Sequence, residues 1–163
     1  GTLEERLKDM KKPEFQHVDR DFLKKMMSVV SFEAAVQDYN KQYRNARLLA
    51  MKNINHNLAC ADDYLMVARS LMKTQNTPES NAECLLYLDK ADLVSKVEDV
   101  NITKMRILLM LRENMTINAV DMIKKYQSQL DVMYQQPHTE EDAEWIAAEH
   151  LWAEKLLERM YLN

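Results

Sequence analysis

Glycine is the residue whose scarcity says most about this chain. The 163 residues include one glycine, Gly1, and three prolines. Without internal glycine a chain cannot build the loops that cradle phosphates, the turn that opens a dinucleotide-binding fold, or the usual hairpin turns between strands. The sequence therefore argues against nucleotide-binding α/β folds, and almost every position is compatible with an α-helix.

Long apolar runs and cysteine clusters are also missing. No stretch approaches the roughly 18 apolar residues that span a membrane, and no signal peptide is visible. An intracellular location is favoured, and an exported form whose signal has been removed stays open. Cys60 and Cys84 stand in predicted helices without a CxxC motif or a nearby pair of histidines, so they do not resemble a zinc site. We expect buried free thiols, with a disulfide between them as the alternative in an oxidising compartment.

Motifs for catalysis and metal binding are absent as well. None of the four histidines, His17, His56, His138 and His150, lies four residues from another. A di-iron site in a helical bundle needs Glu-x-x-His, and Ala147 occupies the glutamate position before His150. No GxSxG motif and no local Ser/His/Asp or Cys/His arrangement is present. The sequence therefore predicts no catalytic residue, no cofactor and no metal ion.

What the chain does contain is a helical repeat of apolar residues. Apolar residues make up 47% and charged residues 29% of the sequence, as in ordinary globular proteins. We expect residues 1–163 to form a single all-helical domain. Within it, residues 1–18 are predicted to be a loosely attached N-terminal helix, ended by Pro13, and a linker.

Residues 57–93 show the predicted unit most clearly. Two runs with apolar residues at spacings of three and four flank a short polar break at residues 74–80, which predicts an antiparallel helical hairpin. Ser80 and Glu83 have the spacing of a capping box, and Pro78 is expected to close the preceding helix.

The other predicted helices follow the same pattern. Two helices are expected to meet near residues 28–31, with one kinked helix as the alternative, and a turn is expected at residues 53–57. Further helices are predicted over residues 100–111 and 117–134, with Thr116 as the N-cap, and from Thr139 to the C-terminus, with Asp142 completing a capping box. The fold is thus predicted to be all-α, with six or seven helices as antiparallel hairpins stacked in a short solenoid or an irregular bundle.

A small–x₃–large–x₂–small spacing recurs along these hairpins. It occurs as Cys84, Leu88, Ala91; as Ala119, Ile123, Tyr126; and as Ala35, Tyr39, Gln42. Over residues 32–134 this resembles tetratricopeptide-type repeats, and the first two sets lie 35 residues apart, near that family's period of about 34. The chain lacks the family's Trp and Gly in the first helices and its closing proline. The resemblance implies a partner-binding groove rather than an active site.

These observations favour a non-catalytic protein-interaction module that binds a protein or peptide partner. The twelve methionines agree, because methionine is common on adaptable binding surfaces. The alternative is a self-associating structural protein: residues 1–60 carry 11 Lys and Arg against 8 Asp and Glu, whereas residues 61–163 carry 11 against 18. An enzyme or cofactor binder hidden in the bundle is less favoured.

Five residues are candidates for partner binding. Trp145 and Trp152 lie seven residues apart on one face of the last helix, where they either complete the core or anchor a partner. A basic segment contains Tyr39, Tyr43 and Arg44. In a nucleic-acid interface the two tyrosines would stack on bases and the arginine would contact phosphates. Nucleic-acid binding is nevertheless less favoured, because the protein is acidic, with a pI near 5.6.

Overall fold

The computed structural model describes residues 20–162, and side chains from residue 25 to residue 161. The predicted helix and linker at residues 1–18 lie outside the described residues. Within these residues the structure contains seven α-helices and no strand, which confirms the all-α prediction. They are α2 (Arg20–Tyr39), α3 (Tyr43–Asn55), α4 (Ala61–Thr74), α5 (Pro78–Val94), α6 (Val100–Arg112), α7 (Thr116–Gln135) and α8 (Glu140–Leu162).

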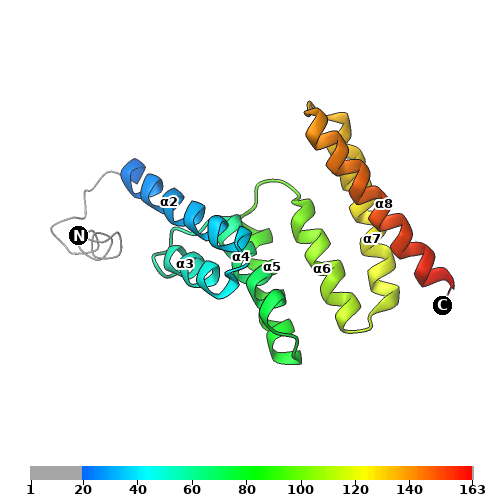
Figure 1. Cartoon of the computed structure of the whole chain (residues 1–163), viewed down its shortest axis with the longest axis horizontal. Coiled ribbons are helices and arrows are strands. Elements are labelled where there is room, and N and C mark those ends of the chain that lie inside the picture. The colour runs from blue at the N-terminus through cyan, green and yellow to red at the C-terminus, as the bar shows by residue number, and fades with distance from the viewer. Residues whose placement is uncertain (1–19, 163) are drawn as a thin grey trace.

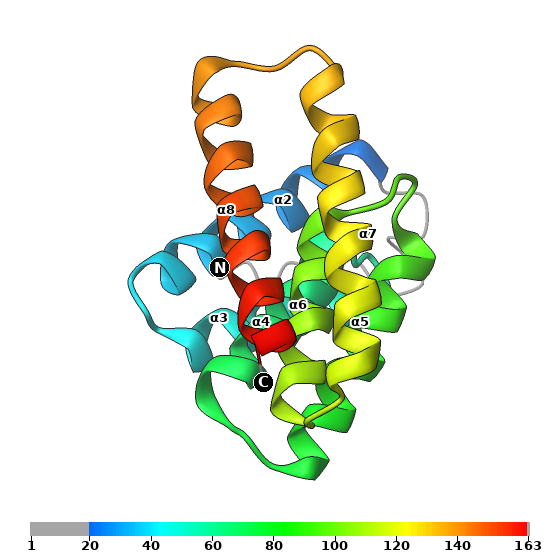
Figure 2. The same cartoon turned by 90° about the vertical axis from the view of Figure 1, so that its right-hand side faces the viewer.

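The helices follow one another along the long axis of the molecule in chain order (Figure 1). Each helix packs against the next one in the sequence, and α2 also contacts α4. Seen from the C-terminal end, α7 and α8 lie side by side and run antiparallel (Figure 2). This arrangement follows from the short connections, because a break of only a few residues makes the second helix return along the first.

Helix α6 joins two hydrophobic cores. Ile102 and Leu109 belong to the core formed with α3, α4 and α5, whereas Val100 and Ile107 belong to the core formed with α7 and α8. A helix that is apolar on most sides is usually buried between neighbours. This position therefore explains why residues 100–111 carry so little polar surface.

Two of the three small–large–small sets lie in the cores. The sets in α5 (Cys84, Leu88, Ala91) and α7 (Ala119, Ile123, Tyr126) are buried at every position. In the third set, Ala35 and Tyr39 are exposed and Gln42 lies outside the helices. The repeated spacing thus marks buried residues in α5 and α7, whereas in α2 the residues with this spacing are exposed.

The start of α5 differs from the prediction. The helix begins at Pro78, and Thr77 is its N-cap: the Ser80 amide donates to Thr77 Oγ1 at 3.0 Å and the Thr77 amide donates to Ser80 Oγ at 3.0 Å. The predicted capping box of Ser80 and Glu83 is therefore wrong by one turn. Proline opens the helix because its fixed φ suits the first helical position, where a missing N–H removes no bond.

The first break also lies elsewhere than predicted. Helix α2 runs without interruption through residues 28–31, and the chain turns at residues 40–42. Ser31 does not cap a helix, because its hydroxyl donates to Asp63 Oδ1 at 2.9 Å. Asn53 was expected in a turn and lies instead in α3, fully buried.

Turns that glycine usually makes are made here by other residues. Lys41, Asn57 and Asn114 have φ near +60°, and each follows the end of a helix. Asparagine tolerates this left-handed conformation better than most residues, and for lysine it costs about 1 kcal/mol. At the later turns, Thr116 is the first residue of α7 and Met115 its N-cap, whereas the predicted Thr139–Asp142 capping box before α8 is confirmed.

The two cysteines are both free thiols, in different surroundings. Cys84 is buried as predicted and its Sγ donates to the Ala68 carbonyl at 3.2 Å. Burial raises the pKa of Cys84 to about 11. Cys60 was predicted to be buried in a helix and is instead the exposed N-cap of α4.

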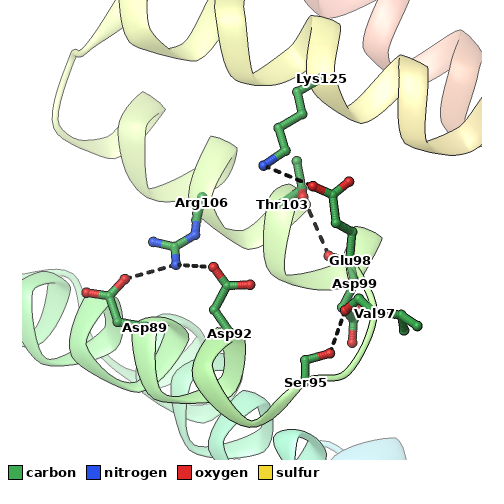
Figure 3. Close-up of polar contacts among 9 residues, drawn as sticks. All are labelled: Asp89, Asp92, Ser95, Val97, Glu98, Asp99, Thr103, Arg106 and Lys125. Atoms are coloured by element: carbon green, nitrogen blue, oxygen red, sulfur yellow. Dashed lines mark hydrogen bonds and ion pairs between the residues drawn. The ribbon is translucent and has the colours of Figure 1, made fainter.

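Salt bridges and the linker at residues 95–99 fix α6 against α5 (Figure 3). Arg106 on α6 forms ion pairs with Asp89 at 2.9 Å and Asp92 at 3.5 Å, both on α5. Asp99 caps α6 by accepting from the Asn101 amide at 2.8 Å. These contacts join α5 to α6 across the connection between the two helices.

Candidate functional site: a groove lined by alternate helices

Helices α2, α4, α6 and α8 line one groove, while the helices between them do not contribute to it. The groove has two adjoining parts of about 660 Å³ and about 430 Å³. Both parts are lined by Arg69 and Lys73 of α4 and by Met105 and Leu108 of α6. We call the two parts together the central groove.

Regular spacing along α4 and α6 explains how the lining is built. On α4, Leu65, Arg69 and Lys73 recur every four residues, and on α6 Lys104 and Leu108 do the same. Residues four apart lie above one another on the same helix face. Each helix therefore presents a stripe of mixed apolar and basic side chains to the groove, beside the stripe that enters the core.

The wall of the groove at the start of α4 is fixed by a buried carboxylate. Asp63 is 2% exposed and accepts hydrogen bonds from Ser31 Oγ and Asn53 Nδ2, both at 2.9 Å. It also accepts from the Cys60 amide at 3.0 Å and from Cys60 Sγ at 3.4 Å. Because these donors satisfy its oxygens, the carboxylate ties α2, α3 and α4 together rather than offering a free reactive group.

The other end of the groove, where α4 stops, is basic. Arg112 of α6 donates to the carbonyl oxygens of Met72 at 2.5 Å and Gln75 at 3.0 Å, and so caps the C-terminus of α4. Arg69 forms an ion pair with Asp38 at 2.8 Å. Lys73 is exposed and has no carboxylate partner within residues 20–162. We call Arg69, Lys73 and Arg112, with the apolar side chains between them, the basic end.

The charge of Lys104 is neutralised by a carboxylate of α8, beside the core that α6 forms with α7 and α8. Its ammonium pairs with Glu149 and lies 4.7 Å from the centre of the Trp152 ring. Glu149 also accepts from the buried Tyr126 hydroxyl at 2.7 Å. Burial, and then this hydrogen bond, raise the pKa of Tyr126 far above its usual value. The three groups link α6, α7 and α8 at the edge of the groove.

The two tryptophans predicted as a pair have different surroundings. Trp145 is 39% exposed and lines the central groove. Trp152 packs against the second core, with its ring edge-on to Tyr126 at a centroid distance of 5.9 Å. Only the first is therefore placed to touch a ligand in the groove.

The other predicted residues lie apart from the groove. Tyr39 at the end of α2 is 87% exposed, while Tyr43 is half-buried and Arg44 is exposed at the start of α3. None of the three is among the described residues that line the groove.

Sequence reasoning missed the residues that make up most of the groove. Arg69, Lys73, Leu108 and Arg112 belong to helices whose periodicity is clear, but periodicity reports only which side of a helix is apolar. The face of a helical stack that stays open depends on how the hairpins are turned relative to one another. The basic residues on α4 and α6 were the available signal, and they were not singled out from the sequence.

The described residues contain neither a cluster of potential metal ligands nor a membrane-spanning helix. Across residues 20–162 no three His, Cys, Asp or Glu side chains are grouped so that they could hold a metal ion. In the same part of the chain, no helix combines the length and the hydropathy needed to cross a membrane.

Comparison with known proteins adds no assignment: no family model matches the chain, and no curated protein or solved structure matches it significantly.

Proposed function

We propose that this protein is a non-catalytic interaction module that binds a segment of a partner protein in the central groove. The observation that carries the proposal is the lining of the groove by four alternate helices with mixed apolar and basic side chains. Phe32, 70% exposed, and Trp145 are among its lining residues. Large exposed aromatic side chains beside a concave surface are typical anchors for a protein partner.

The dimensions suit a peptide segment. Helix α4, which forms one wall, has 14 residues and is therefore about 21 Å long. An extended segment of about six residues, or a helix of about four turns, covers that length. The resemblance to tetratricopeptide-type repeats supports the same interpretation, because it implies a groove that holds a partner.

Three of the charged groups that line the groove favour binding over catalysis, because other residues already hold them. Asp63 is held by four donors, Lys104 by Glu149, and Arg112 by backbone carbonyls. A catalytic acid, base or nucleophile needs a free group within reach of the reacting atom. These three groups instead fix the helices that form the walls.

A pair of substitutions tests the proposal. Leu108→Glu puts a charge in the middle of the groove, whereas Leu86→Glu makes the same change at an exposed position of α5 outside it. We expect partner proteins captured from an extract of the source cells to be lost with Leu108→Glu and kept with Leu86→Glu. Circular dichroism must show that both variants are folded. Equal capture by the two variants would contradict the proposal.

Self-association is the second candidate, and one surface favours it. Leu93, Val94 and Val97 are exposed together at the end of α5 and in the linker that follows, where Figure 3 shows Val97. Apolar patches on a protein surface often mark contacts between proteins. If this patch joins two copies, light scattering will give a mass that rises with concentration and falls for Leu93→Glu. A monomer at all concentrations removes this candidate.

A further inference from the structure

The basic end of the central groove has an excess of positive charge. Among the described residues, those that line it are Arg69, Met72, Lys73, Met105, Leu108, Leu111 and Arg112. They comprise three cations, four apolar side chains and no carboxylate. Asp38 neutralises Arg69 from outside, which leaves two cations without a carboxylate partner within residues 20–162.

Arg112 is held ready to bind an anion. Its two bonds go to the carbonyl oxygens of Met72 and Gln75, which fix the guanidinium while leaving its formal charge in place. The end of α4 offsets part of that charge through its dipole. A guanidinium has five N–H donors, so donors remain for a ligand. Lys73 adds a second, exposed cation from the last turn of α4.

The acidic residues of the groove lie too far away to cancel this charge. Asp62 precedes Lys73 by eleven residues on α4, which corresponds to about 16 Å along the axis. At physiological ionic strength the screening length is about 8 Å. The chain as a whole carries a net charge of −4, so the excess of cations at the basic end is opposite in sign to the net charge of the protein.

Building on the proposed function, we infer that the partner segment is acidic and apolar. Its Asp or Glu side chains bind at Lys73 and Arg112, and neighbouring large apolar side chains lie against Met105 and Leu108. The carboxylates match the two cations, and the apolar side chains match the surface between α4 and α6. Met105 and Leu108 are held in place by the core against which they pack, so the segment is selected by the spacing of its apolar residues as well as by its charge.

Two synthetic peptides and three forms of the full chain test this inference. The probes are fluorescein-labelled peptides of equal length in which Leu alternates with Glu or with Lys. The proteins are the wild type, Lys73→Glu, and Lys124→Glu, which makes the same charge change at an exposed position of α7 outside the groove. Fluorescence anisotropy measures binding at low and at high salt.

We expect the Leu/Glu peptide to bind the wild type more tightly than the Leu/Lys peptide, and to bind less tightly at high salt. Lys73→Glu should weaken it by on the order of tenfold, whereas Lys124→Glu should change it little. Lys73 is exposed and unpaired in the described part of the chain, so this variant is expected to fold normally.

Four results would overturn the inference. They are no binding of the Leu/Glu peptide, equal binding of the two peptides, equal effects of the two substitutions, or tighter Lys73-dependent binding of a single-stranded oligonucleotide. Each of these leaves the proposed function standing if Leu108→Glu still abolishes partner capture. If Leu108→Glu and Leu86→Glu capture the same proteins, the groove itself is the wrong site.

Discussion

Replacing each tryptophan of α8 by alanine separates a core residue from a groove residue. Trp152 packs against Tyr126, and Lys104 lies over its ring. At about 25 cal/mol per Å², the burial of about 150 Å² of tryptophan surface is worth about 4 kcal/mol. The edge-to-face and cation–π contacts add about 0.5–1 kcal/mol each, and residual burial in the unfolded chain reduces the total. Trp152→Ala should therefore lower the free energy of unfolding by about 3–4 kcal/mol.

Trp145→Ala should cost much less. Its ring lies outside both cores and lines the groove, so we expect a loss of about 1 kcal/mol. Urea denaturation followed by circular dichroism gives both values, provided that the slopes agree with the wild type. For a chain of this length the Tm of Trp152→Ala should fall by roughly 10 °C. Equal losses for the two variants would refute the division of α8 into a core part and a groove part.

Four further predictions concern a helix cap, a buried hydrogen bond and the two cysteines. Arg112→Ala should lower Tm, because the carbonyls at the end of α4 lose their donor, and Arg112→Lys should restore only part of the loss. Tyr126→Phe should cost about 1–2 kcal/mol in urea denaturation, since a buried hydrogen bond is lost. With a thiol reagent, Cys60 should react in the native protein and Cys84 only on unfolding. Because the pKa of Cys84 rises from 9.0 to about 11 in the folded state, stability should fall as pH rises from 9 through 11. Cys84→Ala should remove part of that fall.

Helix boundaries show how far the sequence could predict the fold. The periodicity of residues 100–134 predicted the boundaries of α6 and α7 to within a residue or two. The apolar residues of α6 face two cores and those of α7 face one, so both helices carry a clear apolar pattern. The break near Ser31 was wrong because that serine bonds Asp63, 32 residues later in the chain. Local spacing carries no information about such a partner. Pro78 was misplaced for a similar reason. A proline that opens a helix cannot be told from one that follows the end of the preceding helix by the local sequence alone.

The candidate site was less accessible from the sequence than the fold. Trp145 and Trp152 were predicted to share one face of the last helix and either to complete the core or to anchor a partner. In the structure Trp145 lines the groove and Trp152 packs against the core, because a seven-residue spacing places side chains on one face without saying what that face meets. Partner binding by Trp145 stays a prediction. Lys73 and Arg112 are 39 residues apart and meet only through the packing of α6 beside the end of α4. Neither has a local motif, so no pattern indicated them.

Site-specific cross-linking tests the central claim, that a partner segment occupies the groove, most directly. A benzophenone side chain in place of Met105 lies between α4 and α6, and one in place of Leu86 lies on the exposed face of α5. Irradiation with the bound partner, or with the Leu/Glu peptide, should give an adduct from position 105 and none from position 86. Adducts from position 86 alone, or from both positions equally, would contradict the account.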